Sequence, residues 1–353
     1  MSLLEIAVRS DTVDGDGREA IVHGDAIDTL GNDGVFFDPL WRIEVSLTET
    51  EQRLLRTWPV RRLAFIAHAG AASITTVQTY SRLEHSLGVL ALVAHFASED
   101  HPSRIAALLH DVGHLPFSHT LEGLAGLDHH RLTRQRITAI FAAYVTLDSD
   151  AETIIALDDG SLPSALTAVH GGLKLDHLDS FLRSGQAHGR TRSAPQELLR
   201  RLRLRDGAVD ADPVDAVELT DLAIGEAHAQ RSAANLVPVA VVRGLVSRLL
   251  GTGALEPTVL AGMTDDELWS LLLSADETRV DAASLRRHPQ HWYLRRHRDN
   301  SHGAPFSHVI RRSYLDLPMS DGQPTFDPRV DALQQDLPMR VSVQRTKGQA
   351  PVA

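Results

Sequence analysis

The amino-acid sequence predicts a mainly α-helical fold, a helical bundle with a smaller C-terminal extension of helices and some strand. Three observations support this class. The run "HSLGVLALVAHFASE" is apolar almost all round, which is typical of a helix inside a bundle. The run "PSRIAALLHDVGH" carries Ile105, Leu108, Leu109 and Val112 at helical spacing. Only "RLRLRDGAVDADPVDAVEL" alternates and then turns, which predicts one or two strands at most.

The other helices are predicted from caps and apolar stripes, in chain order. "TETEQRLLRTW" has a Thr cap, an acid-rich first turn and an apolar stripe. A further helix is expected from about Arg131 to Ala143. Another is expected in "LTAVHGGLKLDHLDSFLRSG", broken at Gly171 and Gly172. "AANLVPVAVVRGLVSRLLG" and "TDDELWSLLLSAD" then return to helix.

Composition divides the chain into four expected regions. The beginning is rich in Asp and Gly, and the last dozen residues show no apolar anchor. We therefore expect an irregular lead-in at residues 1–45, a helical core at 46–195, a helical region with some strand at 196–340, and a loose tail at 341–353.

Charge and composition limit the function classes. A formal net charge of −11 gives no broad basic surface for nucleic acid or an anionic membrane. The chain has no cysteine, so any metal must bind to His, Asp or Glu, and its 19 histidines are roughly twice the average usage. The N-terminal residues do not read as a signal peptide, and no apolar window looks long enough to span a bilayer. The cytoplasm is the expected location.

Titratable residues recur inside the apolar helices. His85 lies in "RLEHSLGV", His110 and Asp111 in "LLHDVGH", and Asp176 in "LKLDHLDSFL". A buried carboxylate needs a compensating cation or hydrogen-bond donors, and a divalent metal would satisfy all four residues. Two imidazoles and two carboxylates suit Fe, Mn, Co, Ni, Zn or Mg. A hydrogen bond to a backbone carbonyl would explain any one histidine alone, and sequence spacing cannot show that the helices converge.

An ordered series of motifs resembles a known family. "RLEHSLGV", "HDVGHLPFSHTLE", "HHRLT" and "LDHLDSFLR" resemble the HD-domain phosphohydrolases, and within them the deoxynucleoside triphosphate triphosphohydrolase branch. The resemblance covers about residues 20–190 and, more faintly, "RRSYLDLP" near the C-terminus. It implies that the helical core is an HD phosphohydrolase core and that His85, His110, Asp111 and Asp176 are its metal ligands.

The resemblance also implies roles around the metal. Arg82 would contact a phosphate, His114 and His119 would line the phosphates, and Glu122 would orient His119. His129 opens the segment in which the family has His-Glu, although His130 replaces that Glu. The other expected substrate contacts are His68, which replaces a Gln of the family, and His177 and Ser180, which follow Asp176.

The pattern departs from this branch after Asp176. Ser180 replaces a Tyr, and Ser184 replaces an Asp, so the expected sugar-selecting groups are altered. A dNTP triphosphohydrolase therefore stays open beside a nucleotide phosphomonoesterase on a mono- or modified nucleotide and beside a nucleotide-binding regulatory module with little turnover. The expected partner is a nucleotide or another phosphorylated small molecule, and a homo-oligomer stays open. The basic stretch from Arg286 to Arg312 is interpreted as a solvated surface, with phosphate contacts as the alternative.

Overall fold

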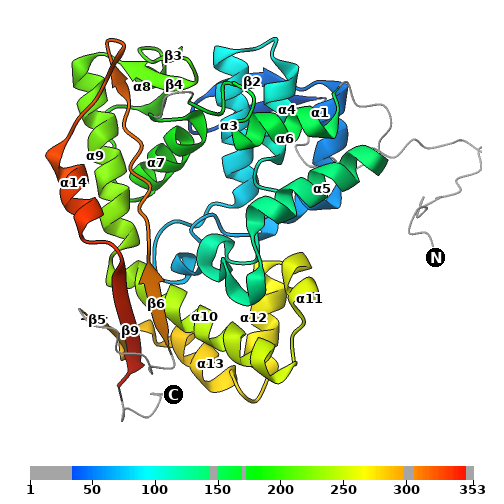
Figure 1. The fold of residues 1–353 in the computed structure, drawn as a ribbon, viewed down its shortest axis with the longest axis vertical. Helices are drawn as coiled ribbons and strands as arrows, with labels where there is room; N and C mark the ends of the chain where they lie inside the picture. The colour runs from blue at the N-terminus through cyan, green and yellow to red at the C-terminus, as the bar shows by residue number, and fades with distance from the viewer. Residues whose placement is uncertain (1–33, 144–148, 169–171, 298–305, 347–353) are drawn as a thin grey trace, which may run out of the picture.

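The computed structural model describes residues 34–143, 149–168, 172–297 and 306–346, and these are mainly α-helical, as predicted. Most of the predicted lead-in and the end of the predicted tail lie outside the described residues. Figure 1 shows one group of helices around α3 and a second group around α10. The bounds of the first group are α1 Glu49–Leu55, α2 Trp58–Arg61, α3 Arg82–Phe96, α4 His101–Leu109, α5 His129–Ala143, α6 Ala151–Asp159, α7 Leu175–Ala187 and α8 Pro195–Leu199.

Helix α3 is the central helix of the first group. Ser81 caps it by accepting a hydrogen bond from the amide of Glu84, whose carboxylate accepts one from the amide of Ser81. Leu90, Leu92 and their apolar neighbours are fully buried, and α4 and α7 pack against this helix. This burial explains why "HSLGVLALVAHFASE" shows no polar face. Short 3₁₀ helices connect the group at Arg62–Phe65 (η1), Gly70–Ile74 (η2), Ser118–Leu121 (η3) and Leu124–Gly126 (η4).

A β-hairpin lies within the region that we expected to be irregular. Strands β1 (Val35–Asp38) and β2 (Ile43–Ser46) pair antiparallel and pack against α3. The hairpin is stable there because its turn residue Trp41 is only 1% exposed and joins the first apolar core. The described part of the lead-in is therefore an ordered part of the core.

The second group surrounds α10. Among the described helices, α10 alone contains a window of residues that is long and apolar enough to cross a membrane. This corrects the expectation that no such window exists, although the criterion uses length and composition alone. Half of that window is buried, and α10 contacts α13 and three strands, which is typical of a core helix. The helices that follow α8 are α9 Pro213–Gln230, α10 Ala233–Thr252, α11 Pro257–Gly262, α12 Asp265–Ser274, α13 Arg279–Arg287 and α14 Pro328–Gln335, with a 3₁₀ turn η5 at Pro289–His291.

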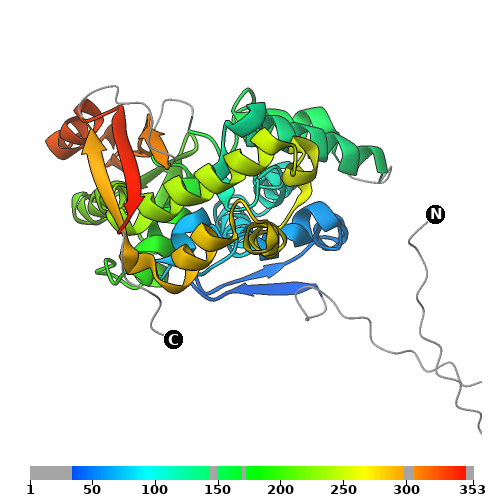
Figure 2. The same ribbon diagram turned by 90° about the horizontal axis from the view of Figure 1, so that it is seen from below.

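Two small sheets complete the C-terminal region. One has the order β3-β4-β7-β8 and the other the order β5-β9-β6. Figure 2 shows the red strand β9 beside an orange strand of the same sheet. Strand β9 corrects the prediction of a loose tail from residue 341, because Val341 and Val343 are buried and β9 pairs with strands on both sides. The strands are β3 Arg203–Arg205, β4 Ala208–Ala211, β5 Trp292–His297, β6 Ser307–Ile310, β7 Met319–Ser320, β8 Gln323–Pro324 and β9 Met339–Arg345.

The two apolar cores do not divide at the predicted boundary of residue 195. Leu219 and Leu222 of α9 belong to the first core, whereas Leu115, Phe117 and Leu121 belong to the core of α10 and α12. The segment after α4 therefore bridges the two cores. The residues of the predicted site lie along the boundary between these two cores.

Candidate metal centre

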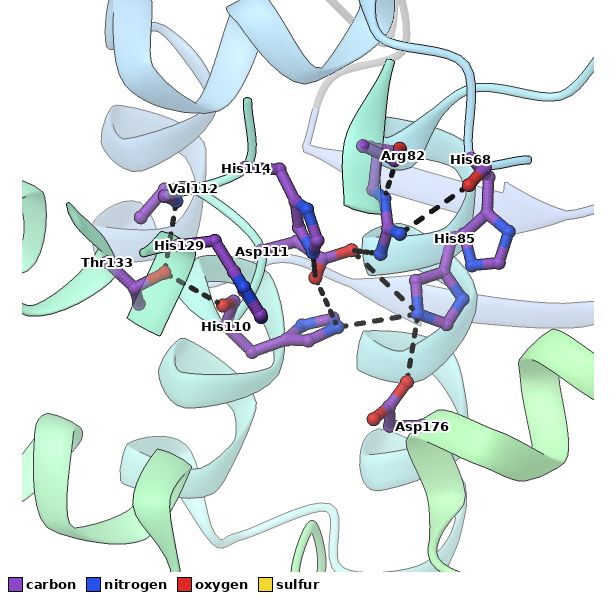
Figure 3. A network of polar contacts seen from close by, with 12 residues as sticks. His68, Arg82, His85, His110, Asp111, Val112, His114, His129, Thr133 and Asp176 are labelled. Atoms are coloured by element: carbon purple, nitrogen blue, oxygen red, sulfur yellow. Dashed lines mark hydrogen bonds and ion pairs between the residues drawn. The ribbon is translucent and has the colours of Figure 1, made fainter. Parts of the chain in front are cut away.

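The ends of three helices bring the predicted metal ligands together. His85 lies in the first turn of α3, Asp176 in the first turn of α7, and His110 caps the C-terminus of α4. Because α4 ends at Leu109, His110 and Asp111 lie on a turn and not on a regular helix. The turn lets both side chains face His85, as Figure 3 shows.

The distances among His85, His110 and Asp176 suit a single ion. Nε2 of His85 lies 3.1 Å from Oδ1 of Asp176 and 3.4 Å from Nε2 of His110. Asp111 approaches His110 at 3.5 Å and His85 at 3.9 Å through its two oxygens. Ligand atoms bound about 2.0–2.2 Å from one ion lie roughly 3–4 Å apart. One ligand atom each from His85, His110 and Asp176 lies within 4.8 Å of the others, so these three predicted ligands converge, and Asp111 lies beside them.

The outer nitrogen of each imidazole has its own partner. Nδ1 of His85 donates to Oδ2 of Asp179 at 2.8 Å, and Nδ1 of His110 donates to the carbonyl of Ala107 at 2.7 Å. These bonds leave Nε2 of both rings facing the centre, which is the arrangement that metal-binding histidines use. The donor set and its orientation therefore fit a divalent ion.

The charged groups around the centre favour the binding of a cation. Burial opposes the charge of Asp176, but Lys174 at 2.7 Å and neighbouring imidazoles hold the pKa of its carboxyl well below its usual value. Burial also lowers the pKa of His85, but its hydrogen bonds to Asp176 and Asp179 outweigh burial and raise that pKa to about 9. The same carboxylates that favour a proton on His85 would favour a divalent cation at this position.

Arg82 lies beside the centre, but the residue is only 4% exposed and its guanidinium is already engaged. It donates to Oδ2 of Asp111 at 2.7 Å and to Oγ of Ser118 at 2.9 Å. Arg82 therefore positions the carboxylate of Asp111. The predicted phosphate contact of Arg82 stays a prediction, because it would require one of these bonds to open.

Three other histidines form a cluster next to Asp111. The rings of His114 and His129 stack with centroids 4.5 Å apart, and His119 meets them edge-on at 4.6 and 4.9 Å. Nε2 of His114 lies 3.0 Å from Asp111, while its buried Nδ1 has no hydrogen-bond partner among the described residues. One ligand nitrogen from each of the three lies within 4.8 Å of the others, so this cluster could also hold a metal ion.

The predicted pair of Glu122 and His119 is wrong. Oε2 of Glu122 accepts a hydrogen bond from Nδ1 of His129 at 2.8 Å. The reason is that the 3₁₀ helix η3 ends at Leu121 and Glu122 is extended, so Glu122 and His119 do not share a helical face. Glu122 orients His129. A carboxylate therefore lies beside His129, although His130 replaces the Glu that follows this histidine in the family.

The remaining predicted contacts lie at the edge of the centre. The ring of His68 stacks on Tyr80 and lies 4.5 Å from that of His85. Nδ1 of His177 lies 2.5 Å from Asp316. Ser180 lies on α7 and is partly exposed, one turn after Asp176. All three surround the centre, and their contact with a substrate stays a prediction.

Sequence reasoning missed the residues that support His85. Asp179 is fully buried and accepts from Trp41 Nε1 at 2.7 Å and from Arg183 Nε at 2.7 Å. Asp38 of the hairpin completes the network by pairing with Arg183 at 2.6 Å. The spacing of Asp176, Asp179 and Arg183 on one face of α7 was a usable signal for part of this network. Nothing local could reveal the contribution of the hairpin.

The fold and this centre define a helical domain built around a His/Asp metal centre, and comparison with known families agrees. Residues 82–183 match the HD domain family. The matched range contains the four metal-ligand candidates and the three clustered histidines. The prediction of an HD domain is therefore confirmed.

The relatives found by sequence are uncharacterized proteins. MJ1154 of Methanocaldococcus jannaschii is 31% identical over 157 residues, which are 41% of this chain and 33% of that protein. YwfO of Bacillus subtilis is 34% identical over 118 residues, or 30% of this chain and 27% of that protein. YdhJ of the same organism is 29% identical and covers 47% of this chain and 53% of its own length. The matches thus cover only about a quarter to a half of the length of these relatives.

Solved structures share the fold over most of the chain. A phosphohydrolase from Bacteroides thetaiotaomicron has a TM-score of 0.67 at 15% identity, covering 88% of this chain and 99% of that one. A hypothetical protein from Aquifex aeolicus has a TM-score of 0.62 at 19% identity, covering 88% and 96%. At these identities the likeness establishes the fold alone.

Proposed function

We propose that the chain is a metal-dependent phosphohydrolase that cleaves nucleotide phosphoesters. Deoxynucleoside triphosphates are the proposed substrates, and a deoxynucleoside and inorganic triphosphate the products. The observation that carries this proposal is the convergence of His85, His110 and Asp176, with Asp111 beside them, next to a second cluster of imidazoles. The HD domain supports the class of metal-dependent phosphoric ester hydrolase. The Bacteroides protein that shares the fold is a phosphohydrolase, which agrees with that class.

The four candidate ligands would hold a divalent ion. Such an ion supplies Lewis-acid polarisation of a phosphoryl oxygen and makes a nearby water more acidic. Asp179 and the carbonyl of Ala107 keep the two imidazoles turned inward, and Arg82 keeps Asp111 in place. The protein thereby holds the site in one geometry before substrate arrives.

The clustered histidines would accept and donate protons at the scissile bond. Burial, supplemented by nearby positive charge, holds the pKa values of His114 and His119 well below the usual value, so both rings are neutral near pH 7. A neutral imidazole can accept a proton from water and later donate one to a leaving oxygen. Glu122 fixes the tautomer of His129 and turns its Nε2 away from the carboxylate.

A nucleotide phosphomonoesterase is the second candidate, and the surroundings of Ser184 favour it. Ser184 is 1% exposed, donates to Glu226, and accepts from Gln78 and from Arg190. Its hydroxyl is engaged inside the protein and does not stand in for the carboxylate that the triphosphohydrolase branch has at this position. The substitution therefore favours a phosphomonoesterase that acts on a mono- or modified nucleotide.

Product identification distinguishes the candidates. The purified protein, with its metal content measured, is incubated with dATP, dGTP, GTP and the corresponding monophosphates, and phosphorus NMR follows the products. We expect inorganic triphosphate from the deoxynucleotides. Inorganic phosphate from monophosphates would replace the proposal by the phosphomonoesterase. Tight nucleotide binding without any product, in every metal tested, would favour the regulatory module.

Variants of the centre test whether turnover depends on it. His110→Ala and Asp176→Asn are expected to lose bound metal and to lower kcat at least 1,000-fold, roughly the effect of removing a metal-dependent group. His95→Ala is a matched control, because His95 is an exposed histidine near the end of the same helix as His85. Unchanged turnover in His110→Ala would contradict the proposal.

A further inference from the structure

A C-terminal segment passes close to the clustered histidines. Residues 311–317, which we call the strap, connect β6 with β7 and run beside α7 as the orange trace of Figure 1. Leu315 anchors the strap in an apolar cluster with residues of α9 and α14. The carbonyl of Leu317 accepts from the amide of Leu173 at 2.7 Å, and Asp316 pairs with His177. The strap is therefore held against the start of α7, where Asp176 lies.

The strap places an aromatic ring between two parts of the candidate site. The ring of Tyr314 lies 6.1 Å from that of His119 and 5.3 Å from that of His177, which it meets edge-on. His119 belongs to the clustered histidines, and His177 follows the metal-ligand candidate Asp176. Tyr314 thus lies between the clustered histidines and the start of α7.

Arg312 adds an exposed positive charge beside Tyr314. Its guanidinium carbon lies 5.2 Å from the centre of the Tyr314 ring, and its Nη2 donates to the Tyr314 hydroxyl at 3.1 Å. Its charge also reaches His130, whose ring lies 3.9 Å from that of His129. Tyr314 therefore holds a planar cationic fork at the edge of the histidine cluster. Such a fork matches the geometry of phosphate oxygens.

We propose that Arg312 binds the terminal phosphates of a polyphosphate substrate while Tyr314 holds Arg312 in place. This inference rests on the proposed function and deepens it, since it assigns recognition of a triphosphate chain to the strap. For the basic stretch that ends at Arg312, it also favours the alternative of phosphate contacts over the interpretation as a solvated surface. Arg312 is a binding residue, and Tyr314 is a positioning residue.

Binding of inorganic triphosphate tests the inference independently of turnover. Isothermal titration of the metal-loaded protein compares inorganic triphosphate with inorganic phosphate for the wild type, Arg312→Ala and Arg311→Ala. Arg311 is the matched control, because it is a neighbouring exposed arginine of the strap. We expect Arg312→Ala to weaken triphosphate binding by about 10- to 100-fold, the loss of a charge-assisted hydrogen bond, with little change for phosphate. Arg311→Ala should bind triphosphate as the wild type does.

Tyr314→Phe separates positioning from packing, because it keeps the ring and removes the hydroxyl that Arg312 binds. We expect an intermediate loss of triphosphate affinity and an unchanged melting temperature. Equal losses in Arg311→Ala and Arg312→Ala would show a nonspecific charge effect and overturn the inference, as would a wild type that binds triphosphate no better than phosphate. Intact triphosphate discrimination without hydrolysis of any nucleotide would instead overturn the proposed function alone.

Discussion

Asp179 and His85 are joined by a hydrogen bond of 2.8 Å between Oδ2 and Nδ1, and both side chains are fully buried. The bond occupies the outer nitrogen of the imidazole, so only Nε2 can face an ion between the helices. Trp41 of the hairpin and Arg183 hold the carboxylate in turn. The geometry of the centre therefore depends on a residue that does not belong to the ligand set.

Replacement of Asp179 by Asn should weaken metal binding without removing a ligand. We expect a loss of about 10- to 100-fold in affinity, because the amide no longer fixes the tautomer of His85. Competition with a chelator measures the affinity. Asp210→Asn is the control, because Asp210 is also buried but lies in the β3-β4 sheet. An equal loss of metal in both variants would indicate a general effect of instability.

Glu122 and His129 are expected to act as one unit. If Glu122 acts by orienting His129, Glu122→Gln and His129→Asn should each lower kcat, and the double variant should be no slower than the slower single variant. Steady-state kinetics of the four proteins measures this coupling. Multiplication of the two losses in the double variant would show that the residues act separately. His119→Asn combined with Glu122→Gln gives the comparison for the pair that the structure does not contain.

Asp265 should make stability depend on pH. Its two oxygens accept from the amides of Phe117 and Ala67, yet burial outweighs these bonds and raises the pKa of its carboxyl to about 6. The folded protein therefore holds this proton more tightly than the unfolded chain does. The associated stability is present below pH 3.8 and is lost as the pH rises to about 6, amounting to about 3 kcal/mol.

Urea unfolding of the wild type and Asp265→Asn between pH 4 and 7 measures this contribution. The free energy of unfolding of the wild type, minus that of the variant, should fall as the pH rises, because Asn does not titrate. A difference that is constant with pH would contradict the expectation. A constant offset is also expected from the hydrogen bond that Asn cannot accept.

Gly88 lies where α3 packs against α7. A Cβ atom at Gly88 would collide with Asp179 and Arg183. Gly88→Ala should therefore destabilise the protein by about 1–3 kcal/mol and weaken metal binding, since it displaces the partner of His85. The control is Gly251→Ala on α10, where a Cβ meets nothing within 4 Å and should stabilise the helix by up to about 1 kcal/mol. Thermal unfolding and chelator competition compare the two variants.

Much of the fold could be predicted because it depends on local sequence. The Thr48 cap of α1 and the apolar α3 follow from side chains within a few positions of each other. The strand β9 could not be predicted in the same way. Its residues become buried only because β5 and β6, from distant segments, pair with it on both sides.

For the candidate site, the sequence by itself determined the residue types and the order of the motifs, and these were sufficient to predict a metal centre from His85, His110, Asp111 and Asp176. Only the tertiary structure decided which groups meet. It paired Glu122 with His129, placed Asp179 behind His85, and brought Tyr314 of the strap to the histidine cluster. The physical reason is that a side chain's partner depends on where its helix ends and which distant segment packs there.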